Sequence, residues 1–114
     1  MKIKVYLAGP YTNNNPTLNT YKAIDVANEL VEVGFIPFIP HLSHFWHNYT
    51  PKPYKFWLKY DIEWLYKCDC LLRIKGESKG ADAEVKLAKK IGMPVFYSVK
   101  KLKKYEPKTR GTYR

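Results

Sequence analysis

The sequence predicts an α/β protein: a three-layer sandwich built on a four- or five-stranded parallel sheet of the flavodoxin or Rossmann-like type. Its 114 residues suffice for one core and not for a second, and a content of 46% hydrophobic and 16% aromatic residues can fill that core. Short β-rich runs alternate with helical patterns along the chain, which is the order of right-handed crossovers between parallel strands. We therefore expect helices on both faces of the sheet.

Two strands and one helix are expected in the first third of the chain. Residues 3 to 8 favour a strand and end before a Gly-Pro pair, which indicates that a loop follows. Apolar residues then recur at helical spacing from residue 17 until a glycine at position 34 ends the pattern. Residues 35 to 39 indicate a second strand, which Pro37 restricts to a sheet edge or a short pairing.

The rest of the chain repeats the alternation after a long connection. Residues 40 to 53 are rich in His, Pro and aromatic side chains, and we expect a loop there that lines a site. Helical periodicity marks residues 54 to 67 and 81 to 91, while strand-like runs mark residues 70 to 74 and 95 to 99. Ligands of such sheets bind at the carboxyl ends of the strands, so the loops after the first three strands are the candidate site.

The net charge of +10 is unevenly distributed. Residues 100 to 114 hold seven basic residues and one acidic residue, a net charge of +6, and we interpret them as a basic tail after a domain over residues 1 to 99. A basic protein favours anionic ligands. The domain shows no basic stripe with interleaved aromatics, so nucleic acid is not expected as the main partner, although an accessory protein driven by the tail is one alternative.

Cysteine content and hydropathy indicate the compartment. Cys68 and Cys70 are too few and too close together to hold a secreted fold or to complete a zinc site. No apolar run approaches about 18 residues and no signal peptide is visible, so we expect a cytoplasmic protein without a membrane partner.

Two carboxylates stand where helical periodicity calls for apolar or sheet-facing residues. Asp61 lies on the apolar stripe of the second helix, and Glu84 lies near the start of the third, on or near its sheet-facing side. A charge at such a position either has a structural partner or performs a role. Both converge on the ligand edge, which favours acid and nucleophile chemistry at a glycosidic centre. Asp69, just before the third strand, is interpreted as a capping or loop-orienting group.

The third helix begins with a candidate anion site. Ser78 and Gly80 form a turn into the helix, whose free N–H groups favour a phosphate. The structural alternative is that Ser78 caps the helix and Gly80 makes the turn.

The residues His41, His44 and His47 recur every third position, as metal ligands can. No acidic residue stands near them, so contact with a ligand or an interface is favoured over a metal site. Most Trp and Tyr side chains are expected in the core, although Tyr6, Tyr11 or Trp46 could stack on a base.

Three blocks together resemble the nucleoside 2-deoxyribosyltransferase-like superfamily, which includes the 2'-deoxynucleoside 5'-monophosphate N-glycosidases. The blocks are Tyr6-Leu7-Ala8-Gly9-Pro10, Asp61 followed by Asp69, and Ser78-x-Gly80-Ala81-x-x-Glu84. The resemblance implies that Glu84 attacks the anomeric carbon of the sugar to give a covalent intermediate. It also implies that Asp61 assists the leaving base or orients the nucleophile and that Tyr6 holds Glu84 in position.

The resemblance further implies a nucleotide substrate, because the monophosphate hydrolases carry a serine where this chain has Ser78. The residues expected to contact the substrate are Gly9, Pro10, Tyr11, His41, Trp46, Ser78, Gly80 and Ala81. The loop after the first strand lacks the arginine of those hydrolases, so Lys79 or a neighbouring subunit would have to supply the charge. No metal or organic cofactor is expected. The protein is expected to form a homo-oligomer. The alternative is a nucleotide-binding protein without catalysis on the same fold.

Overall fold

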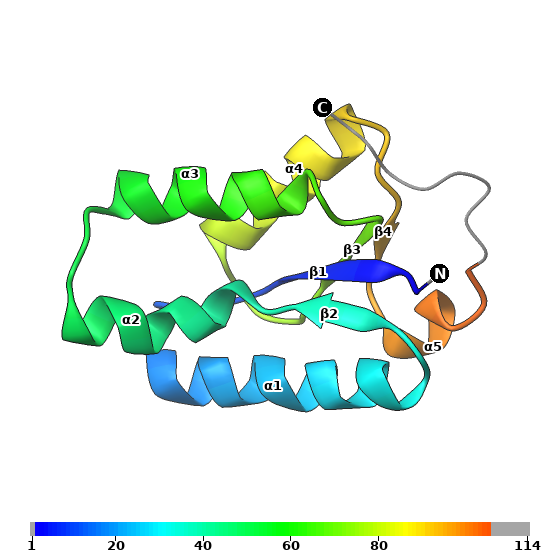
Figure 1. Ribbon diagram of the computed structural model, residues 1–114, viewed down its shortest axis with the longest axis horizontal. Helices are drawn as coiled ribbons and strands as arrows, with labels where there is room; N and C mark the ends of the chain where they lie inside the picture. Colours follow the sequence, from blue (N-terminus) through cyan, green and yellow to red (C-terminus); the bar gives the residue numbers. More distant parts are fainter. Residues whose placement is uncertain (1, 106–114) are drawn as a thin grey trace.

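The computed structural model describes residues 2–105, which form a three-layer α/β sandwich around a four-stranded parallel sheet (Figure 1). The strand order is β2-β1-β3-β4. The strands are β1 (Lys4–Ala8), β2 (Ile36–Phe38), β3 (Cys70–Arg73) and β4 (Val95–Phe96). The predicted fold class is thereby confirmed. β2 is an edge strand, as Pro37 indicated, because only β1 pairs with it.

Helices cover both faces of the sheet (Figure 1). They are α1 (Pro16–Glu32), the short 3₁₀ helix η1 (Pro40–Leu42), α2 (Ser43–Tyr49), α3 (Tyr54–Leu65), α4 (Lys79–Lys90) and α5 (Val99–Leu102). The packing of α1 and α5 forms one core cluster with the sheet, and the packing of α3 and α4 forms the other. None of the helices in residues 2–105 has the length and apolar character that crossing a membrane requires.

Strand β1 divides its side chains between the two cores. Val5 and Leu7 pack on the side of α1 and α5, whereas Tyr6 and Ala8 pack on the side of α3 and α4, and all four are fully buried. The alternation follows from the two-residue period of a strand. It places the Tyr6 phenol, rather than an aliphatic side chain, on the face toward α4.

The expected loop over residues 40 to 53 is largely helical, so this prediction was wrong. η1 and α2 occupy residues 40–49. Local composition did not favour a helix, but His41 and His44, three residues apart, lie on one face of this segment and are buried against the rest of the protein. Burial of that face stabilises a helix that its sequence alone would not form.

The end of the domain also differs from expectation. The last strand stops at Phe96, and Ser98 caps α5 by accepting a hydrogen bond from the Lys101 amide at 3.2 Å. Leu102 is fully buried in the core, and the Tyr105 ring lies 5.1 Å from that of Phe96. Residues 100–105 therefore pack against the domain, while residues 106–114 of the expected tail lie outside the described residues.

Asp69 ties the starts of two neighbouring strands together. Its carboxylate accepts a hydrogen bond from the Lys4 amide at 2.8 Å, and its own amide donates to the Lys4 carbonyl at 2.8 Å. This buried carboxylate thus has the loop-orienting position that the sequence indicated, away from the candidate site.

Candidate active site

A cavity of about 650 Å³ opens at the carboxyl edge of the sheet, between α3, the start of α4, the α2 segment and the loop after β1. We call it the large cavity. Its walls include both carboxylates predicted for the site, Asp61 and Glu84. Of the expected substrate contacts, it is lined by Gly9, Tyr11, His41, Ser78, Gly80 and Ala81. The tertiary structure thus brings together groups from four separate parts of the chain.

Glu84 is held from below by Tyr6. The Tyr6 hydroxyl donates a short hydrogen bond to Glu84 Oε2. Burial raises the pKa of Glu84 to about 7, against the lowering effects of the Tyr6 hydrogen bond and the charge of Arg73. Burial, and next the charge of Glu84, raise the pKa of Tyr6 well above its usual value, so the phenol remains a donor at neutral pH. Glu84 is therefore an oriented carboxyl group that changes charge near neutral pH.

Asp61 shares the cavity and interacts electrostatically with Glu84. Burial raises its pKa to about 7, and the charge of Glu84 adds to the rise. Asp61 Oδ1 is buried and finds no hydrogen-bond partner within residues 2–105. Two carboxyls that influence each other titrate as a pair, so a state with one proton between them is populated near pH 7. That state combines a nucleophile with an acid.

The stripe of α3 that carries Asp61 faces the cavity along much of its length. Tyr54, Trp57 and Leu58 line the large cavity, and of the whole helix only Leu65 is fully buried. Helical periodicity correctly indicated a common face. It did not reveal that most of this face covers a cavity instead of a core, because sequence spacing is the same in both cases.

The start of α4 forms one end of the cavity. Ser78 Oγ accepts a hydrogen bond from the Ala81 amide at 3.1 Å, so Ser78 does cap the helix. Its hydroxyl proton remains available, and Lys79 also lines the cavity. A Cβ at Gly80 would lie 3.9 Å from the Tyr54 hydroxyl. The Tyr54 side chain, from the first residue of α3, therefore reaches the start of α4, whose N-terminus favours an anion.

Lys52 is a cavity residue that the sequence analysis missed. It lies between α2 and α3, and its amino group stands 5.0 Å from the centre of the Phe56 ring and 5.8 Å from that of Trp46. Neither Lys52 nor Lys79 forms an ion pair within residues 2–105. The available signal was that Lys52 is the only lysine or arginine in residues 40 to 53.

His41 stands between the large cavity and a smaller one. Its Nε2 lies 3.1 Å from the Pro10 carbonyl oxygen, which can only accept, so Nε2 carries the proton. Burial lowers the pKa of His41 and favours the neutral ring. Nδ1 is then an acceptor, and it finds no partner within the described residues although the side chain is 5% exposed. Nδ1 is thus free to accept a hydrogen bond from an N–H or O–H group.

The other two histidines fasten the α2 segment. His44 Nδ1 lies 2.7 Å from the Tyr11 hydroxyl, which fixes the Tyr11 ring in the cavity wall. His47 Nδ1 accepts from the Trp57 indole at 2.8 Å and thereby ties α2 to α3. The three histidines thus have three different sets of neighbours.

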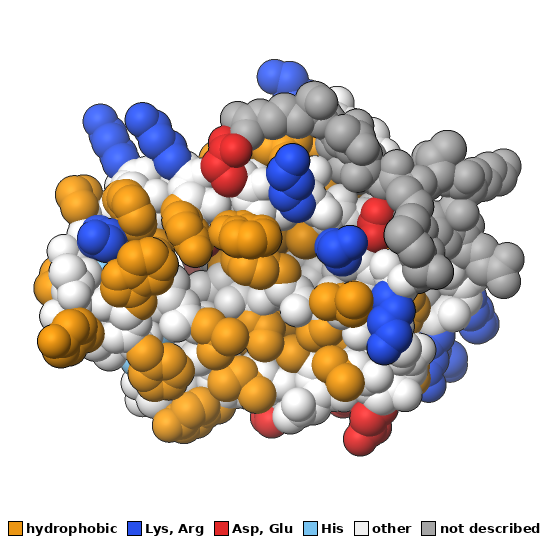
Figure 2. Space-filling model, viewed as in Figure 1, with side chains coloured by type: hydrophobic (Ala, Val, Ile, Leu, Met, Phe, Trp, Pro, Cys, Tyr) orange, Lys and Arg blue, Asp and Glu red, His pale blue; other side chains and the backbone are white. Residues whose placement is uncertain are grey.

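Trp46 was expected to contact the substrate, and the structure places it elsewhere. Trp46 packs with Phe56, Trp57 and Tyr60 on the outer side of α2 and α3, and it is 44% exposed. Two residues after His44 in a helix, it faces the opposite side from the buried histidine. Trp64 is 44% exposed as well, so the expectation that Trp and Tyr fill the core was wrong for much of this set. Figure 2 shows apolar side chains gathered over this side of the molecule.

The loops after β1 and β3 contact each other closely. A Cβ at Gly9 would stand 2.8 Å from the Ile74 Cβ, and one at Gly76 would stand 2.6 Å from the Pro10 Cγ. Gly76 also has a φ of +121°, which favours glycine. The absence of side chains at these two glycines lets the two loops approach each other closely.

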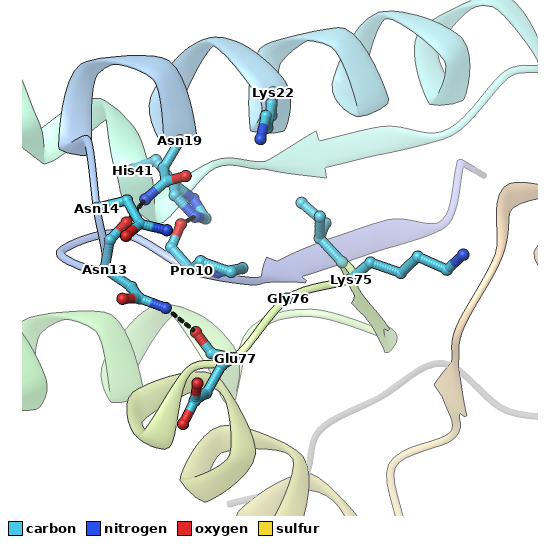
Figure 3. Close-up of a pocket in the computed structure, with 10 residues that line it drawn as sticks. Pro10, Asn13, Asn14, Asn19, Lys22, His41, Lys75, Gly76 and Glu77 are labelled. Carbon is cyan, nitrogen blue, oxygen red and sulfur yellow. Dashed lines mark hydrogen bonds between the residues drawn. The ribbon is translucent and has the colours of Figure 1, made fainter.

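A smaller cavity of about 140 Å³ lies between these two loops and α1 (Figure 3). Pro10 lines it and not the large cavity, contrary to its expected substrate contact. The Asn13 side-chain amide crosses to the Glu77 carbonyl at 3.2 Å and joins the same two loops. Lys22 of α1 and His41 complete the wall drawn in Figure 3.

Comparison with known proteins assigns the fold and the family. No curated protein matches the chain. A solved structure of a 2-deoxyribosyltransferase from the psychrotolerant bacterium Bacillus psychrosaccharolyticus is similar, with a TM-score of 0.60 and 22% identity over 90% of this chain and 92% of that one. At this identity the likeness shows a shared fold. Residues 3–98 match the family model described as "Domain of unknown function (DUF7768)", and the protein belongs to that family.

Proposed function

We propose that this protein cleaves or transfers at the N-glycosidic bond of a deoxynucleoside or its 5'-monophosphate. The observation that carries the proposal is the pair of coupled carboxyls, Asp61 and Glu84, with pKa values raised to about 7 in one cavity. Acid and nucleophile work at a glycosidic centre requires two carboxyl groups with different charge states. The fold shared with a 2-deoxyribosyltransferase supports the same reaction class.

The reaction runs in two steps. The Glu84 carboxylate attacks the anomeric carbon as the bond to the base nitrogen breaks, and the electron pair leaves with the base. Asp61 donates its proton to that base. Water or a second base then attacks the same carbon and releases Glu84. The Tyr6 hydrogen bond orients Glu84 through both steps, and neither step needs a metal ion or an organic cofactor.

We assign the end of the cavity at α4 to the phosphate or the 5'-hydroxyl of the sugar. The Ser78 hydroxyl and the first amides of α4 are donors, and Lys79 carries positive charge at the same end, while Lys52 lines another part of the cavity. Lys79 stands in for the cation that the loop after β1 lacks. This arrangement favours a monophosphate over a free nucleoside, while Tyr11 and His41 remain for the base.

Base release tests the proposal directly. Deoxynucleosides and their 5'-monophosphates are incubated with the protein, with and without an acceptor base, and free or exchanged base is measured by chromatography. We expect release from the wild type and a loss of at least about 1,000-fold in Glu84→Gln, with substrate still bound. Glu29→Gln removes an exposed carboxylate of α1, away from the cavity, and serves as the matched control. Binding without release from any substrate contradicts the proposal and favours a nucleotide-binding protein without catalysis.

We further propose that the protein forms a homo-oligomer through the exposed side of α2 and α3. Phe45, Trp46 and Phe56 are among the exposed large apolar side chains there, and contiguous patches of this kind mark interaction surfaces. Sedimentation of the wild type and of Trp46→Lys tests this. A dimer or larger species that dissociates in the variant supports it, and a monomeric wild type contradicts it.

A further inference from the structure

We propose that Arg73, at the end of β3, is a positioning residue that fixes the first turn of α4 and supplies the positive charge beside Glu84. The proposal deepens the proposed function and rests on the role of Glu84 as nucleophile. Arg73 lines neither of the two cavities, so it acts through other groups and not by touching the substrate.

The hydrogen bonds of Arg73 join the end of β3, the loop that follows it and the first turn of α4. Its guanidinium donates to the Ile74 carbonyl and, at 2.9 Å, to the Gly76 carbonyl. It also donates to Asp82 Oδ1 from two nitrogens, at 2.9 and 3.3 Å. Asp82 lies in the first turn of α4, two residues before Glu84. The planar fork of arginine therefore clamps the loop and the helix start in one arrangement, which lysine cannot reproduce.

Because the Arg73 side chain is little exposed to solvent, its positive charge is weakly screened and affects the pKa of Glu84. The Arg73 side chain is 11% exposed, whereas its partner Asp82 is 71% exposed and well screened by solvent. Of the two ion-paired side chains, the arginine is thus much the less exposed to solvent. Its charge lowers the pKa of Glu84 and opposes the effect of burial. Without it, Glu84 would hold its proton more tightly and be a carboxylate less often at neutral pH.

Other groups around Glu84 set the background for this effect. Tyr6 on β1 hydrogen-bonds to Glu84, and Asp61 on α3 is electrostatically coupled to it. The remaining titratable or charged side chains that line the same cavity are Tyr11, His41, His47, Lys52, Tyr54, Glu77 and Lys79. Arg73 differs from this set because it is a largely covered cation that does not line the cavity.

The test is a titration of the Glu84 carboxyl by ¹³C NMR, with Glu84→Gln used to assign the signal. In Arg73→Gln we expect the Glu84 pKa to rise by about one unit, and in Arg73→Lys, which keeps the charge, by clearly less. Lys90→Gln removes an exposed positive charge from the end of α4 and is the matched control. An unchanged Glu84 titration in folded Arg73→Gln overturns the proposal.

Base release gives the second readout. The acid limb of the pH–rate profile should shift to higher pH together with the Glu84 pKa. The rate of base release by Arg73→Gln should therefore fall about tenfold at a pH below that limb and by less above it. A uniform loss at every pH together with an unmoved Glu84 titration indicates a structural role alone and contradicts the proposal. Where the wild type releases no base at all, the proposed function fails, while the titration still decides whether Arg73 controls Glu84.

A double variant protects the test against misfolding. Arg73→Gln alone leaves Asp82 without its partner, whereas Arg73→Gln with Asp82→Asn removes both charges together. Because Asp82 is exposed and screened, we expect the double variant to show the same rise in the Glu84 pKa. A folded double variant with an unmoved titration overturns the proposal as well.

Discussion

The two faces of the sheet share the same strands but are built for different ends. On the face covered by α1 and α5, fully buried aliphatic side chains such as Leu7, Leu30 and Leu102 close the core. On the opposite face, β1 places Tyr6 beneath Glu84, and α3 and α4 leave a large cavity. The first face stabilises the fold, and the second holds groups whose burial opposes folding at neutral pH. Separating the two lets one small domain carry a costly site.

The largest expected effect is on the cavity face. Asp61→Asn removes the acid, and we expect kcat/KM for base release to fall by about 100- to 1,000-fold with the fold intact. Asp25→Asn, on the exposed side of α1, is the matched control and should leave the rate unchanged. A rate in Asp61→Asn within about twofold of wild type would remove Asp61 from the mechanism and leave Glu84 as the sole acting carboxyl.

Aliphatic truncations on the two faces compare them directly. Leu30→Ala opens the closed core and should lower the free energy of unfolding by about 2 to 5 kcal/mol, with activity per folded molecule retained. Leu58→Ala, at the cavity wall, should lower it by less than about 1 kcal/mol but raise KM, because Leu58 already borders open space. Urea unfolding and steady-state kinetics measure both. Equal losses of stability in the two variants would contradict the distinction between a closed core on one face and a cavity on the other.

The pH dependence of stability isolates the cost of the two carboxyls. Their pKa values are raised to about 7 in the folded protein, so the folded state holds these protons more tightly than the unfolded one. The stability that they contribute is complete below about pH 4 and is lost as the pH rises through 7. At pH 8, Asp61→Asn with Glu84→Gln should therefore be more stable than wild type by several kcal/mol. The two unfolding curves should converge at low pH, and parallel curves would show that the carboxyls are not buried as described.

The smallest expected effect tests the link from β1 to Glu84. Tyr6→Phe removes a hydrogen bond that lowers the Glu84 pKa, so this pKa should rise by about one unit. The acid limb of the base-release profile should follow it. Tyr21→Phe, on the exposed side of α1, should change neither quantity. A Glu84 titration that is the same in Tyr6→Phe and wild type would show that this hydrogen bond has no functional weight.

Local signals in the sequence were sufficient for the framework and for the core of the site. The alternation of strands and helices predicted the parallel sheet, and Pro37 predicted its edge strand. Ser78 at the start of a helical pattern predicted the cap that the structure contains. Asp61 and Glu84 were found because a carboxylate on an apolar or sheet-facing stripe breaks a local pattern. Each of these inferences depends on neighbours within one or two helical turns.

Other features required the tertiary structure. Residues 40–49 form helices because buried histidines outweigh a composition typical of loops, and Trp46 consequently points outward. Leu102 belongs to the core although lysines surround it in the sequence. The contacts of Arg73 with the loop after β3, and the position of Lys52 in the lining of the large cavity, could be recognised only in the tertiary structure.

The sequence by itself determined the order of elements, the alternating faces of β1 and the carboxyls that interrupt apolar stripes. Tertiary structure decided which stripe covers a core and which covers a cavity, and how far each carboxyl is buried. The physical reason is how far apart in the sequence the interacting residues lie. Periodicity and capping arise from hydrogen bonds and side-chain directions within a few residues, whereas burial and electrostatic coupling depend on segments as distant as Tyr6 and Glu84.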